Sequence, residues 1–552
     1  MSSPVKRIPP KPAHSPRDAT SRSLIREQAS NELIFAVVGH VGSGTSEISE
    51  KLRDALENPS LKGGRYDVTI MKARDVIVAW AKSHGIELPP GVLKDERGGK
   101  ESKVLQTTIT LQDLGDEMRK GGDHAAVASA LVARIRATRG KKQKSKVSEG
   151  EPVIPDGARR AYILDSIRHP AEVHLLRSVY QSAFTLFGIV CEEDVRLKRI
   201  MKKYSNAGEE FARQFMERDA HAKELYGQHV SDAFHLADVF IDNTQPQFLK
   251  NGLSNVYWTI PDQLSRIVKL ITHVEIVRPT AAESAMYAAY GAKLRSSCLS
   301  RQVGAAVADF TGTVVSTGTN ETPCAGGGVC LEPTPGKAPN NDGRCAFRPG
   351  EKFCSNTREQ NELIEEIFSI IPNSGDLSAR KNQEKQLRDG RIGYFTEYSR
   401  AVHAEMDAIL SAARRGVPVS GTTLYVTTFP CHYCAKHLVS AGIDEVQFIE
   451  PYPKSKALKL FSDSITMDLD KWAPPSKGGV QVLFRPYTGV APRTYERAFL
   501  KNRALKDAVS GNHIIGDPDW GSAWDLVKVS YPQLEVELTR KVGEPNVQSP
   551  SA

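Results

Sequence analysis

The sequence has no long apolar segment and few cysteines. No apolar run approaches the roughly 20 residues that a membrane-spanning helix requires, and the basic, Pro/Ser-rich residues 1–30 lack the apolar centre of a secretory signal. We therefore expect a disordered basic tail over these residues, a cytoplasmic location and no membrane contact. Thiols stay reduced in the cytoplasm, so the eight cysteines are candidate metal ligands, nucleophiles or buried small residues, not disulfides.

A strong charge of one sign is also missing. The 73 Lys and Arg residues against 65 Asp and Glu leave a net charge of +8, much of it in tails and loops. This balance suits a phosphate-bearing ligand, but it does not form the concentrated basic stripe of a dedicated nucleic-acid binder. A chain of 552 residues is too long for one hydrophobic core, so we expect two domains with tails.

The first domain is expected over residues 31–270. Its β-rich runs, such as LIFAVVG and AYILDS, alternate with amphipathic helical runs. This alternation predicts an α/β fold with a parallel sheet flanked by helices. The polar stretch 138–155 interrupts the pattern and is expected to be a surface loop inside the domain.

The second domain is expected over residues 275–505, after a boundary near 265–280. Its helical and β-rich runs predict a helix–sheet–helix (α/β/α) sandwich with five strands. A Gly/Pro/Cys-rich insertion over 320–395, which ends in a polar helix, interrupts the sandwich. Residues 506–552 are expected to form a C-terminal extension that is partly disordered.

The second domain carries His403 and Glu405, followed 25 positions after Glu405 by Pro430 and then by Cys431 and Cys434. This is the H-x-E…P-C-x-x-C signature of zinc deaminases. Two thiolates and one imidazole bind Zn²⁺ and leave the fourth tetrahedral position open for water, as in catalytic zinc sites. The cysteines open one expected helix and the histidine opens another, and helix N-termini favour thiolates. The two N-termini are therefore expected to converge on one ion.

Glu405 is expected to move protons and not to bind the metal. Zinc lowers the pKa of its bound water towards about 7. Glu405 would take a proton from this water, deliver it to the ring nitrogen of a cytosine and later protonate the departing ammonia. The alternative is a structural zinc site or a pair of buried cysteines. A structural site normally closes with four protein ligands, whereas the motif offers three beside a free carboxylate.

The segments VHAEMDAIL, TTLYVTTFPCHYCAKHLVSAGI and SRQVGAAVADFTGTVVSTGTNETP resemble the deoxycytidylate deaminase branch of the cytidine deaminase superfamily, over about residues 280–490. The resemblance implies that Asn320, after the second strand, contacts the nucleoside, and that Tyr452, after the fourth, lies near the substrate. Arg301 is a candidate phosphate contact because a guanidinium binds phosphate oxygens bidentately. Each residue also has an alternative interpretation without a substrate role. Asn320 would be a turn former, Tyr452 an aromatic that packs in the protein, and Arg301 a charged loop residue exposed to solvent.

Over roughly residues 30–505 the chain resembles the bacterial anti-phage deoxycytidine-nucleotide deaminases. The shared features are a kinase-like N-terminal domain, the GGG-containing insertion after Asn320, and the segments TEYSRAVHAEMDA, IEPYPKS and FRPYTGVAPRTYERAF. The resemblance implies that the protein drains the dCTP and dCMP pool during infection. Deaminases of the superfamily usually assemble, so a homo-oligomer is expected.

Four cysteines lie in the insertion, with gaps of five, fourteen and eight residues between them: Cys324, Cys330, Cys345 and Cys354. They are candidates for a second, structural zinc site that orders a lid over the nucleotide. The gaps contain no C-x-x-C pair, so free or buried thiols are the alternative.

The first domain contains a phosphate-binding loop without its lysine. Residues 39–46 match G-x-x-x-x-G-K-[ST] at a strand-to-helix junction, except that Thr45 replaces Lys. The candidate nucleotide-binding residues are Gly39, Gly42, Gly44, Thr45 and Ser46. The glycines let backbone N–H groups surround a phosphate, and Ser46 can meet Mg²⁺, with Asp165 as a Walker-B-like carboxylate. Phosphate binding survives the loss of the lysine better than phosphoryl transfer does.

Residues 31–245 also resemble nucleoside-phosphate kinases. We expect this domain to bind a nucleoside triphosphate with Mg²⁺, a partner or a regulatory RNA, and to gate the deaminase. The alternative is a relic scaffold used only for assembly.

The leading prediction of activity is hydrolytic deamination of dCTP, dCMP or both to the deoxyuridine nucleotide and ammonia. A second prediction is deamination of a polynucleotide, tRNA or single-stranded DNA, which requires a basic groove with stacking aromatics. Few Lys and Arg with interleaved aromatics surround the motifs, which ranks this prediction lower. A third prediction is a nucleotide-switched P-loop module whose main function is to bind a partner, with deamination as a secondary activity. The complete set of zinc ligands argues against ranking deamination second.

Overall fold

The computed structural model describes most of the chain between Ser30 and His513. The described residues are 30–61, 65–88, 105–145, 148, 150–204, 208–220, 222, 224–249, 251–272, 275–332, 344, 352–370, 377–452, 454–469, 472–501, 505–513, 532, 535, 536 and 539. The tail predicted over residues 1–30 lies outside them except for Ser30, and so does most of the extension predicted over 506–552. Within the described part of the chain, no helix is long and apolar enough to span a membrane.

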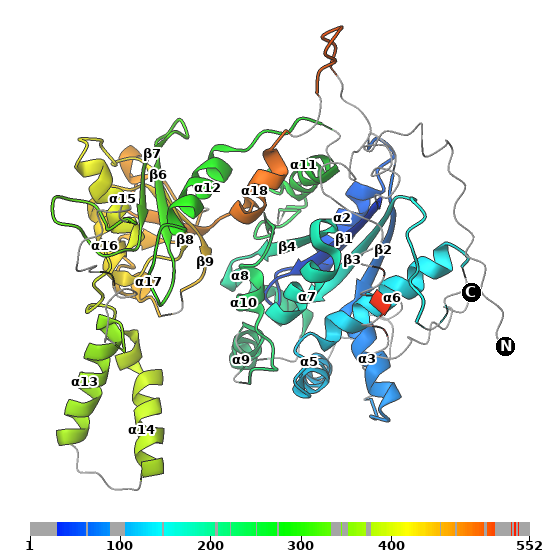
Figure 1. Cartoon of the computed structure of the whole chain (residues 1–552), viewed down its shortest axis with the longest axis horizontal. Helices are drawn as coiled ribbons and strands as arrows, with labels where there is room; N and C mark the ends of the chain where they lie inside the picture. Colours follow the sequence, from blue (N-terminus) through cyan, green and yellow to red (C-terminus); the bar gives the residue numbers. More distant parts are fainter. Residues whose placement is uncertain are drawn as a thin grey trace. The chain divides into compact units, whose positions relative to one another are not determined.

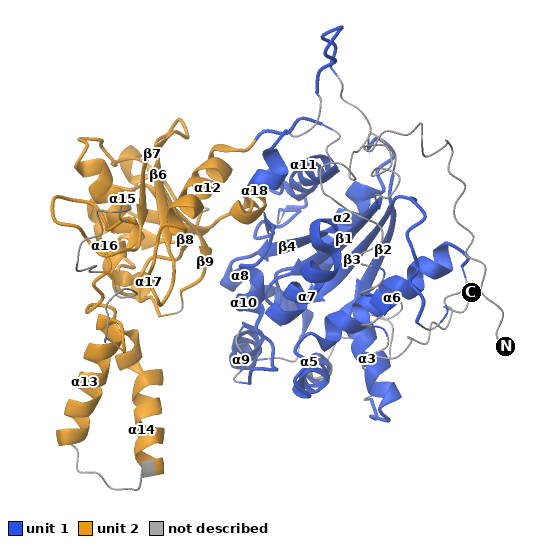
Figure 2. Ribbon diagram, in the orientation of Figure 1, with its two compact units in different colours: residues 1–278, 496–552 blue, residues 279–495 orange. Residues whose placement is uncertain are grey.

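The chain divides into two compact units. Unit 1 comprises residues 1–278 and 496–552, and unit 2 comprises residues 279–495 (Figure 2). The sequence placed the end of the second domain at residue 505, whereas the structure returns the chain to unit 1 from Glu496. Arg497, just past this point, donates to the carbonyl of Ser182 of unit 1, and further on the buried carboxylate of Glu535 accepts hydrogen bonds from Arg139 and Tyr180. Such long-range partners leave no local pattern in the sequence.

Unit 1 is built on a parallel sheet in which its strands follow the order β5-β4-β1-β3-β2 (Figure 1). The strands are β1 (Glu32–Val38), β2 (Asp67–Lys72), β3 (Arg160–Ile167), β4 (Phe184–Val190) and β5 (Val239–Asp242). All seven residues of β1 and of β4 are buried. Central parallel strands are covered on both faces, so they consist of continuous apolar runs without alternation.

Helices connect these strands. They are α2 (Thr45–Leu56), α3 (Ala73–Ser83), α5 (Leu105–Lys120), α6 (Ala126–Lys142), α7 (Pro170–Tyr180), η1 (Gln181–Ala183), α8 (Glu193–Lys203), α9 (Glu209–Ala220), α10 (Val230–Phe234) and α11 (Ile260–Thr272). The loop predicted over 138–155 is partly wrong, since α6 continues to Lys142. The basic composition of this stretch suggested that its side chains are exposed to solvent. The Arg139 side chain is instead fully buried between the carboxylates of Glu32 and Glu535.

Unit 2 has a second sheet in the order β10-β11-β9-β8-β6-β7. Its strands are β6 (Gly304–Ala308), β7 (Val314–Thr319), β8 (Thr423–Thr428), β9 (Glu445–Glu450), β10 (Ile465–Thr466), β11 (Val482–Pro486) and, outside this sheet, β12 (Gly489–Val490). The pair β6–β7 is an antiparallel hairpin, β6 pairs antiparallel with β8, and the remaining neighbours are parallel. The short β10 is a sixth strand, where the sequence predicted five.

The helices of unit 2 lie on both faces of this sheet and in the insertion. They are α12 (Ala281–Lys293), α13 (Ser355–Ile370), α14 (Leu377–Asp389), η3 (Arg391–Tyr394), α15 (Ala404–Ala413), α16 (His432–Ser440), α17 (Ala457–Leu460), η4 (Pro475–Lys477) and the start of α18 (Pro492–Phe499), which belongs to unit 1 from Glu496 on. Among its described residues, the insertion has the α-helix α13 ahead of the polar helix α14, where the sequence predicted only a polar helix at the end. Figure 1 shows α13 and α14 side by side, and Arg380 joins them through an ion pair with Glu365 and a contact with the Phe368 ring.

Two glycines set the distance between the sheet of unit 2 and its helices. A Cβ on Gly318 of β7 would lie 2.2 Å from the carbonyl oxygen of Ala404 and 2.2 Å from the amide nitrogen of Ala408. A Cβ on Gly304 of β6 would lie 2.0 Å from the carbonyl oxygen of Ala289 in α12. Only glycine permits such close backbone approach. The helix that carries the H-x-E motif therefore sits directly on β7.

Candidate active site

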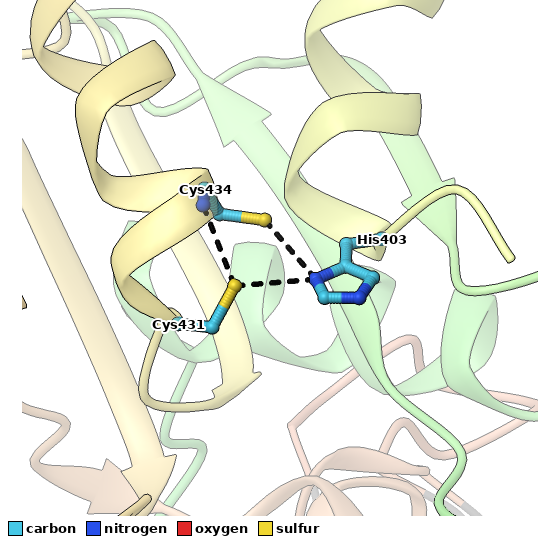
Figure 3. Close-up of side chains that lie close together, drawn as sticks. All are labelled: His403, Cys431 and Cys434. Atoms are coloured by element: carbon cyan, nitrogen blue, oxygen red, sulfur yellow. Dashed lines mark hydrogen bonds between the residues drawn. The ribbon is translucent and has the colours of Figure 1, made fainter. Parts of the chain in front are cut away.

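Three metal-binding side chains converge between the N-termini of α15 and α16 (Figure 3). His403 is the N-cap of α15 and Cys431 is the N-cap of α16. The Nδ1 atom of His403 lies 3.3 Å from the Sγ atom of Cys431 and 3.3 Å from the Sγ atom of Cys434. All three ligand atoms lie within 4.8 Å of one another. The structure thus brings the three predicted zinc ligands together.

The geometry of this group fits a tetrahedral zinc ion. Sulfur ligands usually lie about 2.3 Å from zinc and nitrogen ligands about 2.0 Å from it, so a nitrogen and a sulfur on one tetrahedral ion are about 3.5 Å apart. The distance from His403 Nδ1 to each cysteine sulfur is 3.3 Å, close to this value. The set of one imidazole and two thiols matches the borderline-soft character of zinc. Zn²⁺ is therefore the metal that this donor set binds.

The position of Cys431 favours its thiolate form. The sulfur of Cys431 accepts hydrogen bonds from the Cys434 side chain and, 3.4 Å away, from the Cys434 backbone N–H. These contacts and the neighbouring His403 outweigh the effect of burial and lower the pKa of Cys431 to about 4. A thiolate is the form that binds metal.

Glu405 lies in the first turn of α15 and is 4% exposed. Burial and the nearby Cys431 thiolate raise the pKa of Glu405 to about 7, although His403 opposes the shift. A carboxyl group with such a pKa exchanges protons readily near neutral pH, which suits a general acid–base.

A cavity of about 430 Å³ opens onto this group, within the usual range for small-molecule sites. His403, Glu405 and Cys431 line it. Each of the three predicted substrate residues lines the same cavity: Arg301, Asn320 and Tyr452.

The three candidate substrate residues differ in how many hydrogen bonds or ion pairs their side chains already form within the protein. The Asn320 side chain donates to the carbonyl of Arg301 at 2.7 Å and accepts from the N–H of Val303 at 2.6 Å. The Arg301 side chain is 49% exposed and lies 3.6 Å from the Glu450 carboxylate. Tyr452 packs against the core of unit 2, and burial raises its pKa. Asn320 is thus held by backbone groups, while Arg301 reaches solvent.

Sequence reasoning missed several parts of the cavity wall. They are the residues of the loop 297–303 other than Arg301, the first turn of α13, Phe395, Arg400 and Lys454. Arg400 and Lys454 lie close in sequence to His403 and Tyr452, so proximity to the motifs was the one available signal. The contribution of α13 had no such signal, because its residues reach the cavity only through the fold of the insertion.

The insertion cysteines do not gather into one group among the described residues. The Sγ atoms of Cys324 and Cys330 lie 2.9 Å apart, while Cys354 lines the active-site cavity. Cys345 lies outside the described residues. In that part of the chain, His403, Cys431 and Cys434 are the one group with the spacing of metal ligands. A second zinc site remains a prediction.

The predicted phosphate-binding loop joins β1 to α2. Gly42 and Gly44 have left-handed φ values of 85° and 87°. The Ser46 hydroxyl donates to the Asp165 carboxylate at 2.6 Å, and burial raises the pKa of Asp165. The N–H of Val41 donates to the buried Asp219 at 2.7 Å. One backbone donor of the loop is thus already bound to an internal carboxylate.

Comparison with known proteins gives consistent matches for unit 2. The family model described as "Cytidine and deoxycytidylate deaminase zinc-binding region" matches residues 279–450. The deoxycytidylate deaminase of Enterobacteria phage T2 is 31% identical over 175 residues, which cover 32% of this chain and 82% of that protein. The phage T4 protein of the same name is 30% identical over 175 residues, covering 32% of this chain and 80% of that protein.

Solved structures give weaker likenesses. The dCMP deaminase of cyanophage S-TIM5 in complex with dCMP and dUMP is 16% identical, covers 38% of this chain and 99% of that chain, and has a TM-score of 0.22. A sugar kinase from Janibacter sp. is 13% identical, covers 43% of this chain and 92% of that chain, and has a TM-score of 0.22. At such scores neither likeness supports a statement about fold or function.

Proposed function

The chain belongs to the cytidine and deoxycytidylate deaminase family, and on this basis we propose that it deaminates a deoxycytidine nucleotide. The substrate is dCMP, dCTP or both, and the products are the deoxyuridine nucleotide and ammonia. The observation that carries this proposal is the buried Glu405 beside the group of His403, Cys431 and Cys434, at the end of a cavity of nucleotide size.

The proposed chemistry divides between the metal and Glu405. When bound by His403, Cys431 and Cys434, zinc supplies a Lewis acid that makes water nucleophilic near neutral pH. Glu405 accepts a proton from the attacking water and delivers it to N3 of the cytosine ring. It then transfers the second proton of the water to the exocyclic amine, so that the C4–N bond breaks and ammonia leaves.

Positive charge at the cavity suits the phosphate of the substrate. Arg301, Arg400 and Lys454 reach the cavity wall from three separate segments. Phosphate oxygens bind guanidinium and ammonium groups through charge-assisted hydrogen bonds. We assign phosphate recognition to Arg301 first, since its side chain is half exposed and its bond to Glu450 is long. The position of Asn320 and Tyr452 in the wall of the same cavity supports their proposed roles, Asn320 as a contact of the nucleoside and Tyr452 as a residue near the substrate.

A substrate screen tests this proposal. Purified protein is assayed for ammonia release from dCMP, dCTP, CMP and CTP, with the Glu405→Ala variant as control. We expect release from one or both deoxynucleotides, and loss of activity in the variant with zinc still bound. Deamination of tRNA or single-stranded DNA without deamination of mononucleotides would instead support the polynucleotide alternative.

For unit 1 we propose a regulatory nucleotide site at residues 39–46. The hydrogen bond from Ser46 to Asp165 supports it, because this pair is where a P-loop protein holds Mg²⁺. Thr45 in place of Lys argues for binding without phosphoryl transfer. Thermal shift with ATP, GTP and dCTP in the presence of Mg²⁺ tests the site, and a regulatory RNA is the alternative ligand.

The biological role that we propose is depletion of dCTP against phage infection. The resemblance of residues 30–505 to anti-phage deoxycytidine-nucleotide deaminases supports this role. Cells that express the wild-type chain should lose dCTP on infection, whereas cells that express Glu405→Ala should keep it. Sedimentation of the purified protein tests the expected homo-oligomer in the same preparation.

A further inference from the structure

The loop 297–303 forms one wall of the active-site cavity and contains no helix or strand. It carries Arg301, and Leu299 at its centre is 64% exposed. A loop of this kind holds one conformation only if its ends are fixed by specific contacts. Two consecutive residues just after β7, Asn320 and Glu321, bind both ends of the loop.

Glu321 holds the first residue of the loop. Its Oε2 atom accepts from the N–H of Ser297 at 2.8 Å and from the Ser297 hydroxyl at 2.6 Å. Its Oε1 atom accepts from the N–H and the hydroxyl of Thr322 at 2.8 Å and 2.9 Å. A carboxylate has about four acceptor positions. With four donors bound, Glu321 has none left for a substrate hydroxyl.

Asn320 holds the other end of the loop through its contacts with Arg301 and Val303. The hydroxyl of Ser296, just before the loop, donates to the Asn320 carbonyl at 2.7 Å. The loop is therefore anchored on both sides by the Asn320–Glu321 dipeptide.

The same dipeptide is tied to the zinc-binding segment. The N–H of Val402, the residue before His403, donates to the Glu321 carbonyl at 2.9 Å. Glu321 is 3% exposed. Burial would raise its pKa, but the hydrogen bonds from Ser297 and Thr322 outweigh it and hold the pKa below the usual range. The carboxylate is thus charged and fully bonded.

We propose that Glu321 is a positioning residue that places loop 297–303, and through it Arg301, against the nucleotide. This inference rests on the deaminase function proposed above and on the phosphate role of Arg301. Glu321 lines the same cavity, but its carboxylate already accepts four hydrogen bonds, so in this proposal it acts through the loop and not by contact with the substrate. Its removal is therefore expected to weaken nucleotide binding and to leave the chemical step intact.

Glu321→Gln tests the proposal, because the amide keeps the size of the side chain but turns two acceptor positions into donors. One backbone N–H, of Ser297 or Thr322, then loses its partner. We expect KM for the deaminated nucleotide to rise about tenfold, with kcat within about twofold of the wild type and zinc content unchanged. The matched control is Glu332→Gln, whose parent side chain is 81% exposed, and we expect no change in KM.

A double-mutant cycle separates positioning from a general structural role. In an Arg301→Ala background, Glu321→Gln is expected to raise KM by less than about twofold, since the loop no longer carries the phosphate contact. An equal rise in both backgrounds would overturn the proposal. So would an unchanged KM with reduced kcat or zinc content. If Glu321→Gln does not fold, Ser297→Ala removes one donor and should raise KM about threefold.

Hydrogen exchange tests the anchoring without any substrate. Amides of the loop in the wild type should exchange more slowly than those in Glu321→Gln. Equal exchange would overturn the anchoring. If the wild type deaminates no nucleotide yet the loop exchanges faster in the variant, the proposed function fails and the anchoring stands, so the two failures are distinguishable.

Discussion

The cysteines of the zinc group in unit 2 and the phosphate-binding loop of unit 1 each lie at the junction between a β-strand and the helix that follows it, yet the polar groups of the two sites are arranged differently. In unit 2 three ligand atoms point at one another within 4.8 Å. In unit 1 the loop is bound by its own neighbours: the carbonyl of Ser43 accepts from Asn243, and the N–H of Val41 donates to Asp219. Side chains that converge on a common point define a metal site. Backbone groups that are satisfied internally define a stable loop, and a ligand must compete for them.

Removal of the metal should have the largest effect on deaminase activity. If the activity did not fall, the contrast between the zinc group and the phosphate-binding loop would be wrong. Dialysis against a strong chelator is expected to abolish deamination, and added Zn²⁺ should restore it, because water activation depends on the ion. Ammonia release and metal content are measured on the same samples. Full activity in a zinc-free sample would contradict the assignment of His403, Cys431 and Cys434.

Glu405→Ala should lower kcat by about 10³-fold, since general acid–base catalysis contributes about 10²–10⁴. Zinc content should stay at the wild-type level, because Glu405 is not one of the three converging ligands. Steady-state kinetics with the preferred deoxynucleotide measures the first effect and metal analysis the second. Simultaneous loss of zinc would mean that Glu405 is a ligand.

Gly318→Ala should destabilise unit 2 by about 2 kcal/mol through overpacking. The added Cβ would meet backbone atoms of α15, which cannot move without shifting His403. Chemical denaturation gives the change in unfolding free energy, and metal titration should show weaker zinc binding. Gly291→Ala in α12 of the same unit is the control, since nothing lies within 4 Å of the Cβ that it would add and its backbone is not left-handed.

Ser46→Ala should have the smallest effect on chemistry. Basal deamination is expected to stay within about twofold of the wild type, because Ser46 is not part of the zinc site. The Mg²⁺-dependent thermal shift with a nucleoside triphosphate should disappear. An unchanged thermal shift would mean that the loop of unit 1 is a scaffold and not a ligand site.

The zinc ligands were predictable because their chemistry is local. His403, Cys431 and Cys434 are of the residue types that zinc binds, at a spacing that opens two helices, and the structure places them together. The parallel sheet of unit 1 was also predictable, since buried strands such as β1 are continuous apolar runs. The last turn of α6 was not, because Arg139 is stabilised by Glu535, far away in the sequence.

By itself, the sequence determined the zinc donor set and the parallel sheet of unit 1, because residue type and periodicity depend on near neighbours. Only the tertiary structure decided what surrounds the metal. In the folded chain, the Asn320 side chain is hydrogen-bonded to the loop 297–303 and the start of α13 lines the cavity. Glu535, near the end of the chain, is bonded to residues of unit 1. Each of these results from contacts between distant segments, and a local pattern carries no information about them.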